Sequence, residues 1–238
     1  MKTSRFLLPI GAALLALGLA ACSGDDTNGA SDDTTSETTA VAVETTDPPA
    51  PGMANCAYVE GGTAARPVSL PATTDVPATG TVTATLSTAE GDLVMTLDRA
   101  KAPCTVNSFV SLSEQGYYNE TNCHRLTTTG IFVLQCGDPT GTGRGGPGYS
   151  YADETSPDDT YGPGTVAMAN AGANTNGSQF FIVYEDSPLS PDYTVFGQMD
   201  PASLEIVQAV ASAGNDGSNG EGDGLPLRPV VINSVTIQ

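Results

Sequence analysis

Two stretches of the sequence carry most of the side chains whose types and spacing could do chemistry. Residues 124–138 begin with His124-Arg125-Leu126 and end with F-V-L-Q-C-G-D, and residues 166–181 read V-A-M-A-N-A-G-A-N-T-N-G-S-Q-F-F. His124 is the only histidine, the chain has no G-x-S-x-G motif, and Ser178 sits in N-G-S-Q-F. A hydrolytic triad is therefore not indicated. What remains is a pocket chemistry without a nucleophile, a metal or an acid–base pair.

Two glycine-rich stretches have the composition of ligand-binding loops but not their spacing. Residues 141–148, G-T-G-R-G-G-P-G, lack the Gly-Lys-Ser/Thr ending and the following helix of a phosphate loop. Residues 216–224 are acidic but do not have the ligand spacing of a calcium loop. Both are expected to be ordinary loops, and no cofactor is expected.

Together, the two functional stretches resemble the active site of the cyclophilin family of peptidyl-prolyl cis-trans isomerases. The most specific part is M-A-N-A-G-x-N-T-N-G-S-Q-F-F, and the similarity covers roughly residues 81–238. The H-R-L-T-T form with C-G-D-P-T-G-T-G is similar to exported actinobacterial lipoprotein members. The resemblance implies a mainly β fold, a closed eight-stranded antiparallel barrel capped by two α-helices.

The resemblance also implies that Arg125 is catalytic. The barrier to rotation of an X–Pro bond, about 18–20 kcal/mol, comes from amide resonance. In the twisted transition state the prolyl nitrogen gains a lone pair, so a fixed donor aimed at it stabilises that state above the planar one. A guanidinium remains charged and offers a rigid fork of donors. The competing interpretation makes Arg125 a surface ion-pair partner and the aromatic residues ordinary core.

The substrate-binding residues implied by the family positions fall into three sets. An apolar floor for the proline ring comprises Phe132, Val133, Met168, Phe181 and Leu189. Peptide hydrogen bonds are assigned to Gln135, Gln179 and the backbone of Asn170, and Ala169 and Tyr193 complete the site. Arg144 occupies a gatekeeper position at a second pocket, which receives the residue two before proline. We expect it to favour acidic residues there, unless it pairs with Asp138 or Asp153.

The sequence departs from the usual family pattern in three places. The turn after Leu126 is two residues longer than in H-R-I-x-P-G-F, so Phe132 is assigned from the F-V-L-Q run alone. Tyr193 stands where many members carry His. Pro188 replaces the Trp that grips cyclosporin, so we expect weak inhibition.

The elements that must position these residues follow from local patterns. Alternating apolar residues predict a hairpin, with strands near 81–87 and 93–97, and more strands at 123–127, 132–136, 165–169, 179–184 and 193–199. Helices are predicted at 103–114 and 201–213, each beginning with proline. A last strand at 230–237 is expected to pair with the first.

The N-terminus has the features of a bacterial lipoprotein signal. Lys2 and Arg5 precede an uncharged apolar run that is short for a membrane span, and Leu19-Ala20-Ala21-Cys22 is similar to a lipobox. We expect residues 1–21 to be removed and Cys22 to be lipidated. The alternative is an ordinary secretory signal in which Cys22 is incidental.

The segment after Cys22 has the composition of a spacer. Residues 22–55 are rich in Ser, Thr, Asp, Glu and Pro and have no Lys or Arg, which predicts a disordered acidic linker. Residues 56–80 carry Cys56 and Tyr58, which suggests an N-terminal extension packed on the isomerase domain, residues 81–238.

The mature chain is strongly acidic. Removing Lys2 and Arg5 from eight basic residues leaves six against 27 acidic ones, a formal charge of −21. This balance argues against nucleic acid as a partner and against electrostatic adhesion to anionic lipid. Membrane attachment is therefore expected through acyl chains on Cys22.

Four cysteines remain after Cys22: Cys56, Cys104, Cys123 and Cys136. In an exported protein an even number suggests two disulfides, with three connectivities open. Cys123 and Cys136 flank one predicted hairpin, which favours that pair. A metal site is the rival interpretation, but the chain has one His and no C-x-x-C motif.

These observations predict an extracytoplasmic, monomeric prolyl isomerase, lipid-anchored to the outer face of the bacterial membrane, that assists folding of proline-containing client polypeptides. Two alternatives stay open: a membrane-anchored module that binds proline peptides with little catalysis, and an anchored chaperone with incidental isomerase activity.

Overall fold

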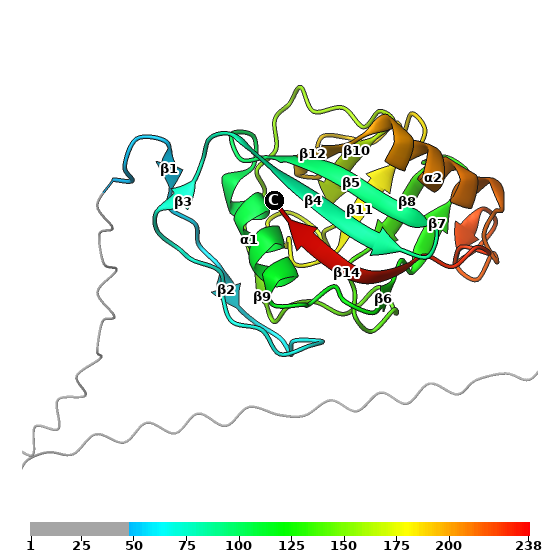
Figure 1. Cartoon of the computed structure of the whole chain (residues 1–238), viewed down its shortest axis with the longest axis horizontal. Helices are drawn as coiled ribbons and strands as arrows, with labels where there is room; N and C mark the ends of the chain where they lie inside the picture. Colours follow the sequence, from blue (N-terminus) through cyan, green and yellow to red (C-terminus); the bar gives the residue numbers. More distant parts are fainter. Residues whose placement is uncertain (1–47) are drawn as a thin grey trace, which may run out of the picture. The chain divides into compact units, whose positions relative to one another are not determined.

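Residues 48–238 are described by the computed structural model, and a single long antiparallel sheet organises them (Figure 1). The predicted signal peptide, Cys22 and most of the predicted linker lie outside the described residues.

The predicted hairpin starts the sheet. Strands β4 (Thr81–Thr88) and β5 (Gly91–Asp98) pair along their whole length. In β4 the side chains of Val82, Ala84 and Leu86 are buried and the intervening threonines are less covered. Strict alternation of this kind places one face of a strand on the core.

Six other main-sheet strands fall close to the expected ranges: β7 (Arg125–Thr127), β8 (Val133–Cys136), β10 (Thr165–Met168), β11 (Phe180–Val183), β12 (Val195–Met199) and β14 (Val231–Ile237). Two short strands of the same sheet, β6 (Thr121–Asn122) and β13 (Asp223–Gly224), were not expected. As predicted, the last long strand, β14, pairs with β4.

The expectation of a closed eight-stranded barrel is wrong. The sheet has ten strands in the order β13-β7-β8-β11-β10-β12-β5-β4-β14-β6. Its two end strands, β13 and β6, are not bonded to each other, so the sheet curls into an open half-barrel. Both end strands are only two residues long, which leaves little edge to pair.

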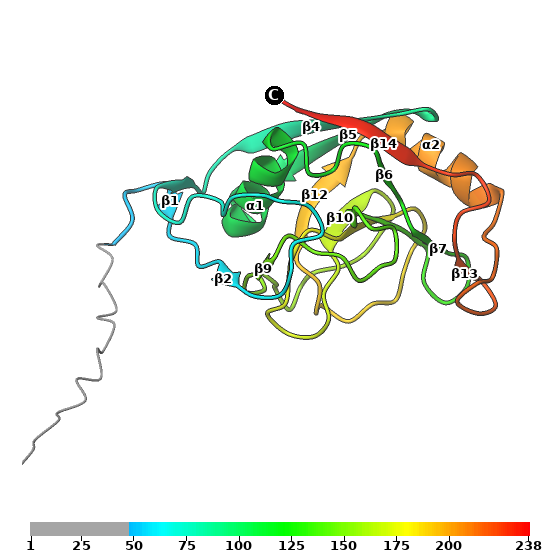
Figure 2. The ribbon, with the colours of Figure 1, turned by 90° about the horizontal axis from the view of Figure 1, so that it is seen from below.

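Two helices lie against the sheet (Figure 2). Helix α1 (Pro103–Glu114) packs on β14, β5 and β3 (Val76–Pro77), with Val106, Phe109 and Leu112 buried, and α2 (Pro201–Ser212) packs on β5. Proline begins each helix, where its missing N–H is not needed. Within residues 48–238, neither helix is long and apolar enough to cross a bilayer.

The segment before the sheet packs on the domain, as predicted for residues 56–80. Strand β1 (Met53–Ala54) pairs with β3 (Val76–Pro77), and β2 (Val59–Glu60) pairs with β9 (Tyr149–Ser150). We call residues 48–80 the N-terminal extension. The predicted linker boundary at residue 55 is wrong, because β1 already belongs to this extension.

Both expected disulfides are present. Cys123 bonds to Cys136 beside the β7–β8 hairpin, and Cys56 bonds to Cys104 at the start of α1. The second bridge ties the extension to the domain.

The central strands are buried on both faces. One face of β8, β10 and β11 joins the main core, through Leu134, Met168 and Phe180. The opposite face joins a smaller cluster that includes Val133, Ala167 and Phe181. Consecutive residues on these strands therefore project to opposite faces and pack in different clusters.

Candidate functional site

A pocket of about 150 Å³ opens on the face of the sheet that carries the smaller cluster. It is lined by residues from β7, β8 and β11 and from the loops that follow β7, β10 and β11: Arg125, Ile131, Val133, Gln135, Ala169, Asn170, Phe181, Leu189 and Tyr193. We call it the proline pocket, after the ring that the family resemblance predicts it to hold. Six of the nine lining residues are apolar or aromatic, and the other three are Arg125, Gln135 and Asn170.

The register of the sheet builds the pocket's floor and rim. Arg125 is paired with Gln135, Gln135 with Phe181, and Phe181 with Ala167, so these four residues form one row across four strands. Paired residues in antiparallel strands project to the same face. The row therefore places the side chains of Arg125 and Phe181 on the same face of the sheet, with Gln135 between them.

Arg125 is held by two partners. Its Nε donates to the carboxylate of Asp223 at 2.9 and 3.0 Å, and its Nη2 donates to the same carboxylate at 2.6 Å. Its Nη1 donates to Oε1 of Gln135 at 3.2 Å. A guanidinium has five N–H donors. One N–H on each of Nη1 and Nη2 therefore has no partner among residues 48–238.

The ion pair sets the charge state of the site. The hydrogen bond from Arg125 lowers the pKa of Asp223, so this carboxylate is ionised at neutral pH. The same bond raises the pKa of Arg125. The neighbouring His124 is buried, and burial lowers its pKa, so its ring is neutral at pH 7. Arg125 and Asp223 therefore carry the charge at this end of the pocket.

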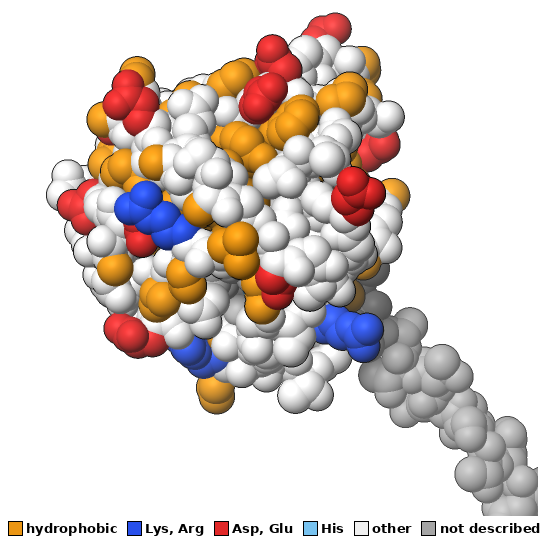
Figure 3. Space-filling model, turned by 90° about the vertical axis from the view of Figure 1, so that its right-hand side faces the viewer, with side chains coloured by type: hydrophobic (Ala, Val, Ile, Leu, Met, Phe, Trp, Pro, Cys, Tyr) orange, Lys and Arg blue, Asp and Glu red, His pale blue; other side chains and the backbone are white. Residues whose placement is uncertain are grey.

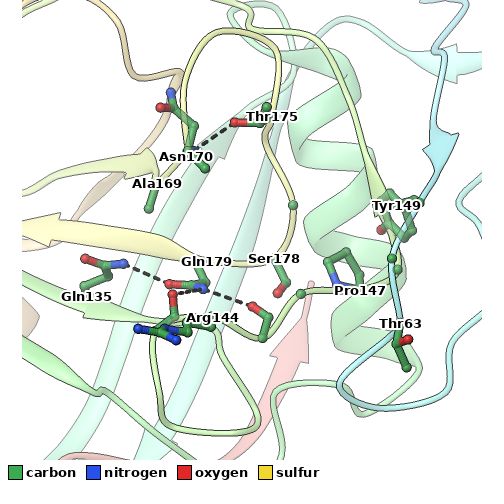
Figure 4. Close-up of a pocket in the computed structure, with 18 residues that line it drawn as sticks. Thr63, Gln135, Arg144, Pro147, Tyr149, Ala169, Asn170, Thr175, Ser178 and Gln179 are labelled. Carbon is green, nitrogen blue, oxygen red and sulfur yellow. Dashed lines mark hydrogen bonds between the residues drawn. The ribbon is translucent and has the colours of Figure 1, made fainter. Parts of the chain in front are cut away.

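A chain of hydrogen bonds continues from Arg125 to the glycine-rich loop. Gln135 Nε2 donates to Gln179 Oε1 at 2.9 Å, and Gln179 Nε2 donates to the carbonyls of Gly143 and Gly145 at 3.0 and 2.9 Å (Figure 4). Each amide is thereby oriented by both of its polar atoms. The site is preorganised before substrate arrives.

Another part of the lining, Leu189 and Tyr193, comes from the loop between β11 and β12. Tyr193 packs edge-on against Phe181, with ring centroids 5.5 Å apart. The hydroxyl of Tyr161 donates to the Tyr193 carbonyl at 2.8 Å and accepts from its amide at 3.0 Å. These two hydrogen bonds hold the loop between β11 and β12, which also carries Leu189.

Two predicted floor residues lie elsewhere. Met168 is paired with Phe180 and is buried in the main core, and Phe132 packs on Tyr184 near α2. Side chains alternate along a strand, so residues 131, 133 and 135 share the pocket face and Phe132 points away. Ile131 occupies the pocket instead, at the end of the longer turn. The assignments of Phe132 and Met168 to the floor were wrong.

A second hollow of about 520 Å³ adjoins the proline pocket and shares Gln135, Ala169 and Asn170 with it (Figure 4). Gln179 and Arg144 line this hollow. Arg144 is exposed, and its guanidinium forms no ion pair with any residue in the described range, including Asp138 and Asp153. We call this hollow the second pocket.

The sequence patterns missed two residues of the site: Ile131, which lines the pocket, and Asp223, which holds Arg125. Asp223 lies 98 residues from Arg125 in a glycine-rich loop, where no periodicity marks it. Ile131 has a usable signal, because it lies two residues before Val133 and four before Gln135.

Within residues 48–238, no group of three or more His, Cys, Asp or Glu side chains is arranged to hold a metal ion. Acidic side chains are spread over the face shown in Figure 3, and Lys and Arg side chains on it lie apart from one another.

The chain is similar to a known protein family and to several of its members. The model of the family described as cyclophilin type peptidyl-prolyl cis-trans isomerase/CLD matches residues 83–237. The probable peptidyl-prolyl cis-trans isomerase B of Mycobacterium leprae is 46% identical over 199 residues, covering 77% of this chain and 66% of the relative. The chain thus spans slightly less than two thirds of that relative's length.

Other relatives are covered more fully. Peptidyl-prolyl cis-trans isomerase A of Mycobacterium tuberculosis is 41% identical over 175 residues, which is 66% of this chain and 92% of the relative. A crystal structure of a cyclophilin type isomerase from Cryptosporidium parvum has a TM-score of 0.59 at 33% identity and covers 67% of this chain and 98% of its own. The same protein was solved in the presence of the dipeptide Ala-Pro, with a TM-score of 0.58.

Proposed function

Because the chain belongs to the cyclophilin-type peptidyl-prolyl cis-trans isomerase family, we propose that it catalyses cis–trans isomerisation of X–Pro bonds with Arg125 as the catalytic residue. The observation that carries this proposal is the fixed guanidinium of Arg125 at the rim of an apolar pocket. Asp223 and Gln135 hold it, and two of its donors remain for substrate.

The chemistry needs only positioning and one donor. A proline ring seated on Phe181, Val133 and Leu189 keeps one side of the peptide bond in place. As the bond twists, the prolyl nitrogen becomes pyramidal, and a free N–H of Arg125 stabilises the lone pair that appears. The planar ground state offers no such acceptor, so the interaction lowers the barrier instead of only tightening binding.

The polar groups beside Arg125 serve the flanking peptide in this proposal. Gln135 and the backbone of Asn170 lie where the proline pocket meets the second pocket. Hydrogen bonds there would anchor the peptide on one side of the bond while the other side turns.

We also propose that the clients are proline-containing polypeptides outside the cytoplasm, reached from an anchor at Cys22. The support is the signal-like N-terminus, the lipobox-like L-A-A-C and the acidic spacer. Two disulfides among residues 48–238 are consistent with an oxidising compartment.

Isomerisation of an X–Pro peptide by catalytic amounts of protein, followed by NMR exchange or a protease-coupled assay, tests the proposal. Arg125→Ala should lower kcat/KM at least about tenfold, roughly 1.4 kcal/mol, with little change in melting temperature. Arg228→Ala is the matched control, because Arg228 is ion-paired to Glu90 away from the pocket.

Two outcomes would contradict the proposal. Full activity in folded Arg125→Ala would exclude Arg125 as the catalytic donor. Peptide binding without acceleration at trace protein concentration would instead identify a binding module.

A further inference from the structure

The N-terminal extension forms part of the second pocket. Besides Gln135, three sets of residues line this pocket: the glycine-rich loop at 143–149, residues of the segment 169–179, and Gly61, Gly62 and Thr63 of the extension. The family match begins only at residue 83, so this third wall lies outside it. In Figure 4, Gln135 and Ala169 lie at one end of the pocket and Thr63 at the other.

The wall is joined to the glycine-rich loop by main-chain hydrogen bonds. The Gly61 amide donates to the Gly148 carbonyl at 2.9 Å, and the Ala65 amide donates to the Gly146 carbonyl at 2.8 Å. These bonds extend the β2–β9 pairing along the pocket's edge. Residues 61–63 therefore have a defined place beside the pocket.

Two further anchors hold the extension to the body of the domain. Nη1 of Arg66 donates to the carbonyls of Gly116, Tyr117 and Asn119 at 3.1, 2.9 and 2.7 Å. The Cys56–Cys104 disulfide fixes the chain on the other side of the wall. The wall is thus held by a disulfide on its N-terminal side and by the hydrogen bonds of Arg66 on its C-terminal side.

Two main-chain amides of the wall have no hydrogen-bond partner among residues 48–238. Among residues 48–238, the amides of Gly62, Thr63 and Ala64 donate to no other group, although those of Gly61 and Ala65 are bonded. Gly62 has a φ of 75°, a conformation that favours glycine, and its missing side chain leaves the main chain open. Exposed amides at the edge of a pocket suit an extended peptide, whose carbonyls need donors.

We propose that residues 61–63 are a specificity-determining wall that contacts the client peptide beyond the residue bound next to proline. This inference rests on the proposed isomerase function. A peptide whose proline occupies the proline pocket runs past Gln135 and Ala169 into the second pocket, at about 3.3 Å per residue. Its side chain two positions before proline lies in this pocket, between Arg144 and the wall, and the preceding main chain meets Gly62 and Thr63.

A bulky side chain on the wall tests the proposal. Assays on the full chain would use succinyl-Xaa-Ala-Pro-Phe-4-nitroanilide with Xaa as Gly, Leu or Phe. Thr63→Trp should lower the ratio of kcat/KM for Phe over Gly at Xaa by about fivefold or more. Thr74→Trp is the matched control, because Thr74 is an exposed threonine of the same extension that lines no pocket described above; it should leave the ratio unchanged.

A binding measurement separates this inference from the proposed function. Titration with the Gly peptide, followed by NMR, should shift the amide signals of Gly62 and Thr63 together with signals of Phe181 and Tyr193. Shifts at Phe181 and Tyr193 alone, or an unchanged Phe-to-Gly ratio in Thr63→Trp, would overturn the wall and leave the isomerase proposal standing. Absence of any shift would overturn both.

Discussion

At the scale of single residues, the ion pair between Arg125 and Asp223 is the feature that distinguishes this pocket from a plain apolar cleft. The two side chains are 35% and 26% exposed, so solvent screens their attraction and the pair contributes little to stability. Its larger effect is geometric. A carboxylate that accepts from both Nε and Nη2 fixes the plane of the guanidinium, and Gln135 fixes the remaining nitrogen.

Removing the charge of Asp223 should therefore affect turnover through Arg125. Asp223→Asn keeps the shape of the side chain but accepts fewer hydrogen bonds from Arg125, so we expect kcat/KM to fall about two- to fivefold, roughly 0.4–1 kcal/mol. In an Arg125→Ala background the same change should have no further effect, because the two residues act as a unit.

Glu221→Gln is the control for this cycle, since it removes one acid from the same loop and Glu221 is exposed. If Asp223→Asn lowered activity equally with and without Arg125, the carboxylate would act on substrate by some route other than the arginine.

Arg144 carries the other charge near substrate. Its exposure and lack of an ion pair in the described chain leave it free to meet a peptide. We expect peptides with Asp or Glu two residues before proline to turn over a few-fold faster than peptides with Lys there, because an exposed ion pair is worth about 0.2–1 kcal/mol.

This preference should weaken with added salt and disappear in Arg144→Ala, whereas Arg99→Ala should retain it. Equal turnover of the Glu and Lys peptides at low ionic strength would mean that Arg144 does not contact substrate.

At the scale of elements, the sequence was most informative where apolar periodicity was regular. The β4–β5 hairpin and both helices lie within a few residues of their predicted bounds. In each of them the apolar residues recur at a regular spacing along the whole element. The two-residue strands β1, β2, β3, β6, β9 and β13 were not predicted, since two residues cannot show a period.

The same reasoning explains which parts of the site could be predicted. Strand alternation places Gln135 and Val133 on one face, and applied strictly it would have excluded Phe132. Met168 lies two residues after Val166 on the same strand, so its side chain projects to the same face, which is the main core. Asp223 depends on how a distant loop folds back on β7, which is tertiary information.

The extension is the element whose anchoring is open to a direct test. Cys56→Ser with Cys104→Ser removes its covalent tie, while Arg66 and β2 keep weaker contacts. We expect local release, seen as faster hydrogen exchange at the amides of Gly61 and Ala65, with amides of the β4–β5 hairpin unchanged. Cys123→Ser with Cys136→Ser is the control. Unchanged exchange at Gly61 and Ala65 would show that the noncovalent contacts suffice.

At the scale of the whole molecule, charge limits how the protein meets a membrane. From Cys22 onward the chain has six basic and 27 acidic residues, so anionic lipid repels it. Within residues 48–238, neither helix is suited to crossing a bilayer. Attachment by acyl chains at Cys22 is the route that this composition favours, and two or more chains are needed for stable anchoring.

If the proposed lipid anchor is Cys22, Cys22→Ser should release the protein from membranes without changing the domain. The mutant should appear in the soluble fraction after cell fractionation, and its kcat/KM on an X–Pro peptide should match that of the detergent-solubilised parent, because Cys22 lies more than 25 residues before the described domain. Ser23→Ala, which changes the neighbouring residue and keeps the thiol, is the matched control and should stay with the membrane. If Cys22→Ser still sediments with membranes after a high-salt wash, attachment comes from a segment other than Cys22, and the lipoprotein proposal is wrong.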